Sequence, residues 1–260
     1  MDSNYELIDL YHAYDAALLD RFYVDVLEPC FGVSPDGLES VGVMHRQLAH
    51  GNHAPNEAHV LHIAVVKDKT TGVIVAGVSF EYYKRSNCGL VAYLATNPNI
   101  DTRRMNLGVY LAAHCADVII PYEAQRHGYK YCDAAFVESH SDSVEHDTMV
   151  PAHRRSILAT KIGIRYLAFD YVTPRLESGK QKCRHMYLGV ETRFCLRENG
   201  KDIGMDSSIV AAFLIDYYNV AMGSEAAACD IDIQRQLKWL AANPVLPLIE
   251  TTAFQPVARL

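Results

Sequence analysis

The sequence has no long apolar run, which argues against a membrane-spanning protein. No stretch approaches the roughly 20 uninterrupted apolar residues that a transmembrane helix requires. The first four residues, Met1 to Asn4, are acidic and polar, unlike the basic and then apolar start of a secretory signal. Half of the residues are hydrophobic, which is enough to bury a large core. We therefore expect a cytoplasmic protein that contains no membrane segment.

Closely spaced cysteines are also missing. The seven cysteines are an odd number, and no two of them form a Cys-x-x-Cys pair. The pattern argues against a zinc–cysteine framework and favours reduced thiols that serve as small core residues. Three nearby histidines, His140, His146 and His153, have acidic residues between them, but their spacing matches no common zinc pattern. The sequence therefore predicts no bound metal.

Positive charge is scarce, since the net charge is −7. This balance argues against nonspecific binding of nucleic acid, which depends on neutralising phosphates. The segment from Pro151 to His185 is an exception, with eight basic residues against two acidic ones. Such a basic stretch suits a small polyanion or an acidic partner protein, and a solvated basic surface is an equally good interpretation.

The periodicity of the apolar residues predicts an order of helices and strands. Short turns between the three central strands indicate antiparallel neighbours, and a strand–helix–strand crossover indicates a parallel pair. These features predict an α/β fold with a mixed sheet flanked by helices. The expected elements are a strand at 5–10; helices at 15–28, ended by Pro29, and at 35–48; strands at 59–66, 73–83 and 88–96; a helix at 106–128 with a kink at Pro121; a strand at 131–137; a helix at 151–162; strands at 164–172 and 185–190; and helices beyond Asp206.

The junction between the strand at 88–96 and the helix after it is the most informative feature. Backbone N–H groups at a helix start, aided by the helix dipole, form a natural site for a pyrophosphate. A small residue is needed wherever the backbone approaches a phosphate closely, and Gly108 provides one. Many helices begin near a glycine, so the turn by itself does not define the ligand.

The strand, loop and helix start together resemble motif A of the GNAT superfamily of N-acyltransferases, whose consensus is Arg/Gln-x-x-Gly-x-Gly/Ala. Arg103, Leu107 and Gly108 match this motif. Asn106 occupies the position of the first glycine, and asparagine is the next-best residue for a positive φ angle. The resemblance implies a GNAT-like fold with a splayed central sheet.

A second segment, Lys161 to Ile164, resembles the helix-to-strand junction that ends motif B of the same superfamily. The resemblance extends over roughly residues 1–195. It implies an acyl-CoA-binding catalytic domain there, and residues 196–260 form a C-terminal helical extension packed on it. These C-terminal helices are alternatively expected to cover the substrate cleft or to form a homodimer contact.

The resemblance also implies where an acyl-CoA donor would bind. The backbone of Leu94, Ala95 and Thr96 would hydrogen-bond the pantetheine arm. The backbone amides that follow would hold the pyrophosphate, and one of two arginines would contact the phosphate oxygens. This second set comprises Arg103, Arg104, Met105, Asn106, Leu107 and Gly108.

The catalytic group is a separate question. Direct attack of an amine on a thioester requires a base that removes a proton from the amine. Many GNAT enzymes also use a tyrosine acid four residues before the motif-B glycine, but Ala159 occupies that position here. The first candidate base is Glu138, at the end of a strand, and the other candidates are His140, His146, Asp147 and Glu81.

These features predict transfer of an acetyl or longer acyl group from acyl-CoA to a small-molecule amine, without a metal. An acidic acyl carrier protein, docked on the basic stretch, is an alternative donor. A GNAT-fold protein that binds an acyl thioester without catalysis is the alternative from another class, and Asn106 and Ala159 favour it.

Overall fold

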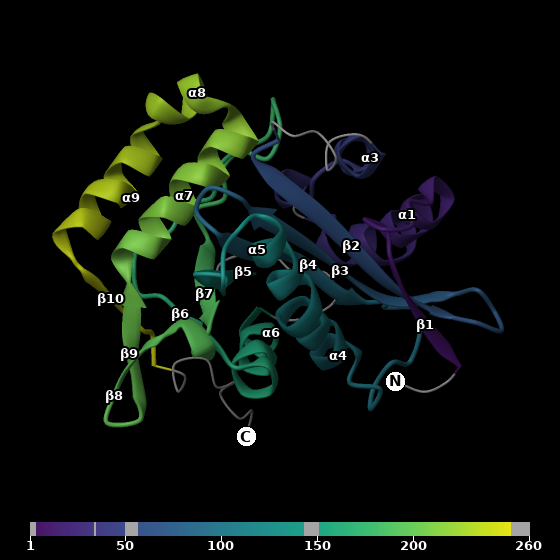
Figure 1. Ribbon diagram of the computed structural model, residues 1–260. Helices are drawn as coiled ribbons and strands as arrows, with labels where there is room; N and C mark the ends of the chain where they lie inside the picture. Colours follow the sequence, from purple (N-terminus) through teal and green to yellow (C-terminus); the bar gives the residue numbers. More distant parts are fainter. Residues whose placement is uncertain (1–3, 34, 50–56, 143–150, 251–260) are drawn as a thin grey trace. The chain divides into compact units, whose positions relative to one another are not determined.

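The structure, a computed structural model, describes residues 4–33, 35–49, 57–142 and 151–250 (Figure 1). The chain divides into two compact units. Unit 1 consists of Met1–Lys84 and Gly89–Cys132, and unit 2 of Arg85–Cys88 and Asp133–Leu260.

Unit 1 contains four strands in the spatial order β1-β2-β3-β4, with helices on both faces. Strand β2 pairs antiparallel with both β1 and β3. The strands are β1 (Tyr5–Asp9), β2 (His59–Asp68), β3 (Ile74–Tyr83) and β4 (Cys88–Thr96). The helical segments are α1 (Ala16–Phe22), η1 (Tyr23–Leu27), α2 (Glu28–Phe31), η2 (Pro35–Gly37), α3 (Val41–Ala49), α4 (Leu107–His114), η4 (Cys115–Ile119) and α5 (Ile120–Arg126).

Strand β2 is apolar along most of its length because both of its faces are buried. Alternate residues, such as Leu61 and Ile63, pack in the core with residues of α1 and α3, for example Phe22. The residue between them, His62, points to the opposite face and contacts Glu123 of α5. Strand β2 thus carries a buried histidine on each face: His59 lies on the face of Leu61 and Ile63, and His62 lies on the opposite face.

Two prolines lie inside helical segments. We expected Pro29 to end the first helix, and this prediction is wrong because α2 continues to Phe31. Before it, η1 forms a wider π turn, in which the Glu28 N–H bonds to the carbonyl of Tyr23, five residues earlier. The same arrangement occurs at Pro121, which follows the π turn η4. A local π turn relieves the missing N–H and the ring clash that normally break a helix at proline.

Unit 2 contains two sets of hydrogen-bonded strands and four α-helices among its described residues. In one set β7 lies between β5 and β6 and is antiparallel to both. The other has the order β10-β9-β8 and lies beside α7 (Figure 1). Its elements are β5 (Ala134–His140), α6 (Pro151–Ile157), η5 (Leu158–Ile162), β6 (Ile164–Tyr166), β7 (Met186–Glu191), η6 (Thr192–Phe194), β8 (Leu196–Glu198), β9 (Lys201–Asp206), α7 (Ser207–Met222), α8 (Ser224–Ala228), α9 (Ile231–Ala242) and β10 (Val245–Pro247).

Two predicted strands of unit 2 have different bounds in the structure. Strand β5 starts at Ala134 and extends to His140, so the candidate base Glu138 lies within the strand. Strand β6 ends at Tyr166, because the following backbone bonds to β10 instead: the Ala168 N–H donates to the carbonyl of Pro247. The β8–β10 sheet was not expected from the sequence.

The order of elements confirms the predicted fold class. Counting each continuous α-helical run once and leaving out the three-residue turn η2, the order through β7 is β-α-α-β-β-β-α-β-α-β-β. This is the GNAT-like α/β order that the sequence predicts, with strands flanked by helices. The division into residues 1–195 and 196–260 stays a prediction.

Candidate functional site

At the start of α4, no capping side chain of the described residues accepts the backbone N–H groups. Asn106, the N-cap residue, has a left-handed backbone with φ 52°, and its side chain caps no N–H. The amides from Leu107 to Val109 have no acceptor within the helix, because each lies in its first turn. The helix start therefore presents donors, together with the positive end of the helix dipole.

Three other helices, α1, α7 and α9, begin differently. Helix α1 is capped by Asp15, α7 by Asp206 and α9 by Asp230, each through a carboxylate that accepts backbone N–H groups. Within the described ranges, no side-chain cap of this kind is found at α4. An anion with several acceptor oxygens, such as a pyrophosphate, fits a helix start of this kind.

Gly108 is required neither by the backbone nor by packing. Its φ angle is not positive, and a Cβ atom built on it would meet no heavy atom within 4 Å. By contrast, a Cβ on Gly77 would lie 2.4 Å from the ring of Phe22, so packing excludes a side chain there. The open space at Gly108 leaves room for a ligand to approach the backbone of α4.

The two predicted phosphate-binding arginines differ in their contacts. Arg103 donates from Nε and Nη2 to the two carboxylate oxygens of Asp101, both at 2.8 Å, and its side chain is 88% exposed. The side-chain hydrogen bonds from Arg103 lower the pKa of Asp101 to about 2. Arg104 is exposed, has φ 72°, and has no hydrogen bond or ion pair to the residues that the structure describes.

The three strand residues predicted to bind the pantetheine arm lie at the carboxyl end of β4. Leu94, Ala95 and Thr96 are half-buried. The carbonyl of Thr96 accepts a hydrogen bond from the Cys30 thiol at 3.6 Å. Met105, Asn106 and Leu107 follow in the loop and at the helix start, so all the predicted cofactor residues are close in sequence and lie in unit 1.

The candidate bases are divided between the units. Glu81 lies on β3 in unit 1, where the hydroxyl of Tyr83 donates to its Oε2. Glu138 and His140 lie on β5 in unit 2. His146 and Asp147 lie outside the described residues, and their roles stay predictions.

Sequence reasoning missed a direct partner of Glu138. Tyr171 lies 33 residues further along the chain, and its hydroxyl donates a hydrogen bond to Oε1 of Glu138. Burial, followed by the nearby charge of Glu138, raises the pKa of Tyr171 well above its usual range, so the hydroxyl remains a donor. No local motif marks this tyrosine, because its partner is distant in the sequence.

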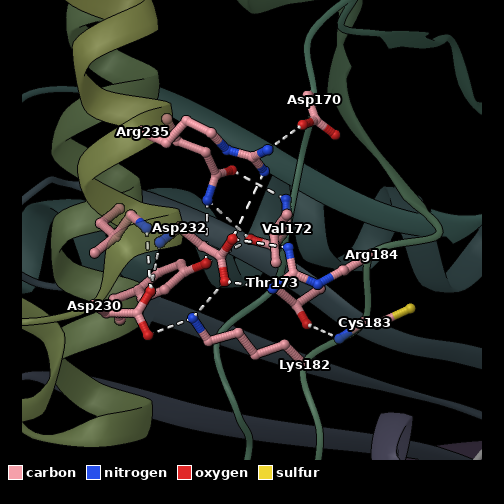
Figure 2. Close-up of polar contacts among 12 residues, drawn as sticks. Asp170, Val172, Thr173, Lys182, Cys183, Arg184, Asp230, Asp232 and Arg235 are labelled. Atoms are coloured by element: carbon pink, nitrogen blue, oxygen red, sulfur yellow. Dashed lines mark hydrogen bonds and ion pairs between the residues drawn. The ribbon is translucent and has the colours of Figure 1, made fainter.

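The basic stretch is largely neutralised by acids within the chain. Arg155 is buried and bonds to Asp142 at 2.7 Å. Figure 2 shows a second group, in which Lys182 and Arg184 point toward Asp232 at the start of α9, at 2.9 Å and 2.8 Å. Arg165 pairs with Asp202, and Lys180 with Glu177. Five of the eight basic residues therefore have acidic partners.

Two kinds of site are not found among the residues that the structure describes. No group of three or more His, Cys, Asp or Glu side chains is placed to hold a metal ion. No helix in the described ranges has both the length and the apolar character needed to cross a membrane.

Among known proteins, only solved structures resemble this chain, and the resemblance is one of fold. No family model matches the sequence. No curated protein matches it either. Solved structures of acetyltransferases resemble its fold at low sequence identity. The ribosomal-protein-S18-alanine N-acetyltransferase from Escherichia coli has a TM-score of 0.43 and 12% identity, over 75% of this chain and 97% of that one.

Two further acetyltransferases are similar to a comparable degree. A GNAT family acetyltransferase from Elizabethkingia anophelis, solved with acetyl-CoA bound, has a TM-score of 0.40 and 12% identity, over 73% of this chain and 99% of that one. The spermidine N-acetyltransferase SpeG from Vibrio cholerae has a TM-score of 0.41 and 10% identity, over 74% and 97%. Identities this low do not define a substrate, so the function must be argued from the residues of this chain.

Proposed function

We propose that the chain is an N-acyltransferase that moves an acetyl or longer acyl group from acyl-CoA to a small-molecule amine. The start of α4 carries this proposal. Its amides from Leu107 to Val109 are uncapped by a side chain, the space at Gly108 is open, and Arg104 has no partner among the described residues. These features together suit a pyrophosphate.

The residues that hold the donor follow from this arrangement. The backbone at Leu94 to Thr96 binds the pantetheine arm, and the α4 amides bind the pyrophosphate. Arg104 takes the phosphate contact, because Arg103 is already engaged by Asp101. The bound donor supplies a thioester carbonyl for attack and a thiolate that leaves.

The chain itself supplies the base. The Glu138 carboxylate accepts a proton from the ammonium form of the acceptor, which frees the nitrogen lone pair for direct attack. The tyrosine acid common in GNAT enzymes is replaced by Ala159, a buried residue of η5. Proton transfer to the leaving thiolate therefore falls to solvent or to another group.

Thermal-shift measurements with acetyl-CoA, longer acyl-CoAs and free coenzyme A test donor binding. We expect the melting temperature to rise with these ligands, because a ligand that binds only the folded state stabilises it. The absence of any rise with all of them would refute the proposal. Release of free thiol across a panel of amines then tests turnover, and Glu138→Gln is expected to abolish most of it.

The two alternatives give different results in the same assays. A binding protein without catalysis would show the thermal shift but release no thiol with any amine. A carrier-protein donor would require acyl carrier protein for thiol release. The ion pairs of Arg155, Lys182 and Arg184 reduce the free positive charge that such a partner would contact.

A further inference from the structure

Tyr171 is almost completely buried, with 2% of its surface exposed, and its hydroxyl contacts the carboxylate of Glu138. It lies in an irregular segment after β6, where regular strand pairing has ended. Strand pairing therefore does not hold this residue. Some other part of unit 2 must fix the position of its hydroxyl.

Side chains from the C-terminal helices take the place of a neighbouring strand. Gln236 of α9 accepts the backbone N–H of Val172 at 3.1 Å and donates to the carbonyl of Val172 at 3.2 Å. Tyr218 of α7 donates to the same carbonyl at 2.8 Å and accepts from Gln236 at 3.1 Å. Both side chains are buried, so these bonds fix the peptide next to Tyr171 without competition from water.

Charged residues attach the two flanks of this segment to the same helix (Figure 2). On one side, Arg235 of α9 pairs with Asp170 at 2.9 Å. On the other side, Thr173 is hydrogen-bonded to Cys183, which lies between the ion-paired Lys182 and Arg184. We call Asp170, Lys182, Arg184, Asp230, Asp232 and Arg235 the charge network.

We propose that Tyr171 is a positioning residue for the base Glu138, and that Gln236 and Tyr218 hold it in place. The proposal rests on the function proposed above, in which Glu138 accepts the proton. The buried hydroxyl of Tyr171 donates to Oε1 and thereby fixes the orientation of the carboxylate. The C-terminal helices, which lie outside the resemblance to GNAT motifs, thereby take part in catalysis.

The substitution Tyr171→Phe removes only the hydroxyl and keeps the buried ring. We expect kcat to fall by about 10- to 100-fold, since small displacements of a reacting group have effects of this size. The KM for acyl-CoA should stay unchanged. The acidic limb of the kcat profile should move to higher pH, because a carboxylate that loses a donor holds its proton more tightly.

Two further variants make the test specific. Tyr166→Phe is the control: it removes the hydroxyl of another buried tyrosine of unit 2, and its kcat should have the same pH profile as that of the wild type. Gln236→Met should lower kcat in the same direction as Tyr171→Phe. Because Gln236→Met can also unfold the protein, Tyr171→Phe, confirmed as folded by its melting temperature, decides the outcome.

The results separate this inference from the proposed function. If the wild type is active and Glu138→Gln is inactive, but Tyr171→Phe keeps the wild-type kcat and acidic limb, the positioning role is wrong and the function stands. If the wild type releases no thiol with any amine, the proposed function fails, and the positioning role fails with it. If the wild type and Glu138→Gln are equally active, acyl transfer stands, but Glu138 is not the base and the positioning role fails.

Discussion

Arg103 and Arg104 are neighbours in the sequence, but of the two only Arg103 has an acidic partner, Asp101, among the described residues. The exposed pair between Arg103 and Asp101 would have to break before Arg103 could bind a phosphate. Arg104 needs no such rearrangement. At the scale of single residues, this difference predicts which arginine contributes more to the affinity for coenzyme A.

Arg104→Gln should weaken coenzyme A binding by roughly tenfold, which corresponds to about 1.4 kcal/mol and is the size of a charge-assisted hydrogen bond. Arg103→Gln should weaken binding less. In the wild type, the cost of breaking the Arg103–Asp101 pair offsets part of what Arg103 could contribute to the affinity. Arg46→Gln, on the exposed surface of α3, is the matched control and should have none. Isothermal titration measures all three, and an equal loss for Arg46→Gln would remove the specific role of Arg104.

His62 is a second residue with an unusual environment. Its ring is 1% exposed and lies between two carboxylates: Nδ1 is 2.9 Å from Asp9 and Nε2 is 3.0 Å from Glu123. Burial by itself would lower the pKa of His62, but the hydrogen bonds to Asp9 and Glu123 outweigh it and raise that pKa above 6.5. Other ionisable groups around this cluster are Tyr11, His12, His114, Arg126 and His127.

A histidine whose pKa rises on folding stabilises the folded state fully below its unfolded pKa, near 6.5, and loses this contribution as the pH rises through the folded pKa. His62→Gln should therefore destabilise the protein most at about pH 6, and the difference from the wild type should narrow toward pH 9. Urea denaturation at several pH values measures this difference. If the difference in unfolding free energy stayed constant from pH 6 to pH 9, the claim that folding raises the pKa of His62 would be wrong.

At the scale of elements, the start of α9 combines a cap with an ion pair. Asp230 accepts the N–H groups of Asp232 and Ile233, at 3.0 and 3.2 Å, and also contacts Lys182. Asp170 belongs to the same charge network, but it and Arg235 are 73% and 52% exposed. An exposed ion pair contributes little to the free energy of unfolding, whereas the loss of a helix cap lowers that free energy more.

Asp230→Ala should lower the free energy of unfolding by about 1–2 kcal/mol, because it removes a helix cap and a half-buried ion pair. Asp170→Ala should lower it by less than about 1 kcal/mol. Chemical denaturation of the two variants compares them directly. Equal losses would mean that the cap does not stabilise α9 as its geometry indicates.

Elements defined by local signals could be predicted from the sequence. The bounds of β4, Cys88–Thr96, are those expected, and Gly163 ends its helical run with a φ of 85°. Elements that depend on distant partners could not be predicted. The helix through Pro29 needs a π turn that no residue type specifies, and the segment after Tyr166 leaves the sheet because its partner lies about 80 residues away.

The candidate site shows the same division. The run from Leu94 to Gly108 is local, and the structure places it at a strand end and a helix start, as the motif implies. The contact between Tyr171 and Glu138 is not local, and periodicity gives no indication of it. The basic stretch could be counted from the sequence, but its acidic partners at Asp230 and Asp232 could not.

At the scale of the whole molecule, the charges of the basic stretch are balanced mainly inside unit 2. The chain has a net charge of −7, and five of the eight cations of the basic stretch are paired with acidic residues, so the chain offers little general attraction for an acidic protein. Donor recognition is therefore expected to depend on a local site, the start of α4, where donors are uncapped by a side chain.

The titration of coenzyme A into the wild type, Gly108→Glu and Gly108→Gln tests this central claim most directly. A Cβ atom at Gly108 would meet no heavy atom of the described residues within 4 Å, and Glu and Gln are similar in size. An acidic residue in the first turn interacts favourably with the helix dipole, so the Glu variant should melt no lower than the Gln variant. We predict saturable binding by the wild type and at least about tenfold weaker binding by the Glu than by the Gln variant, because only Glu repels the phosphates. No binding by the wild type, or equal affinity of the two variants, would contradict the account.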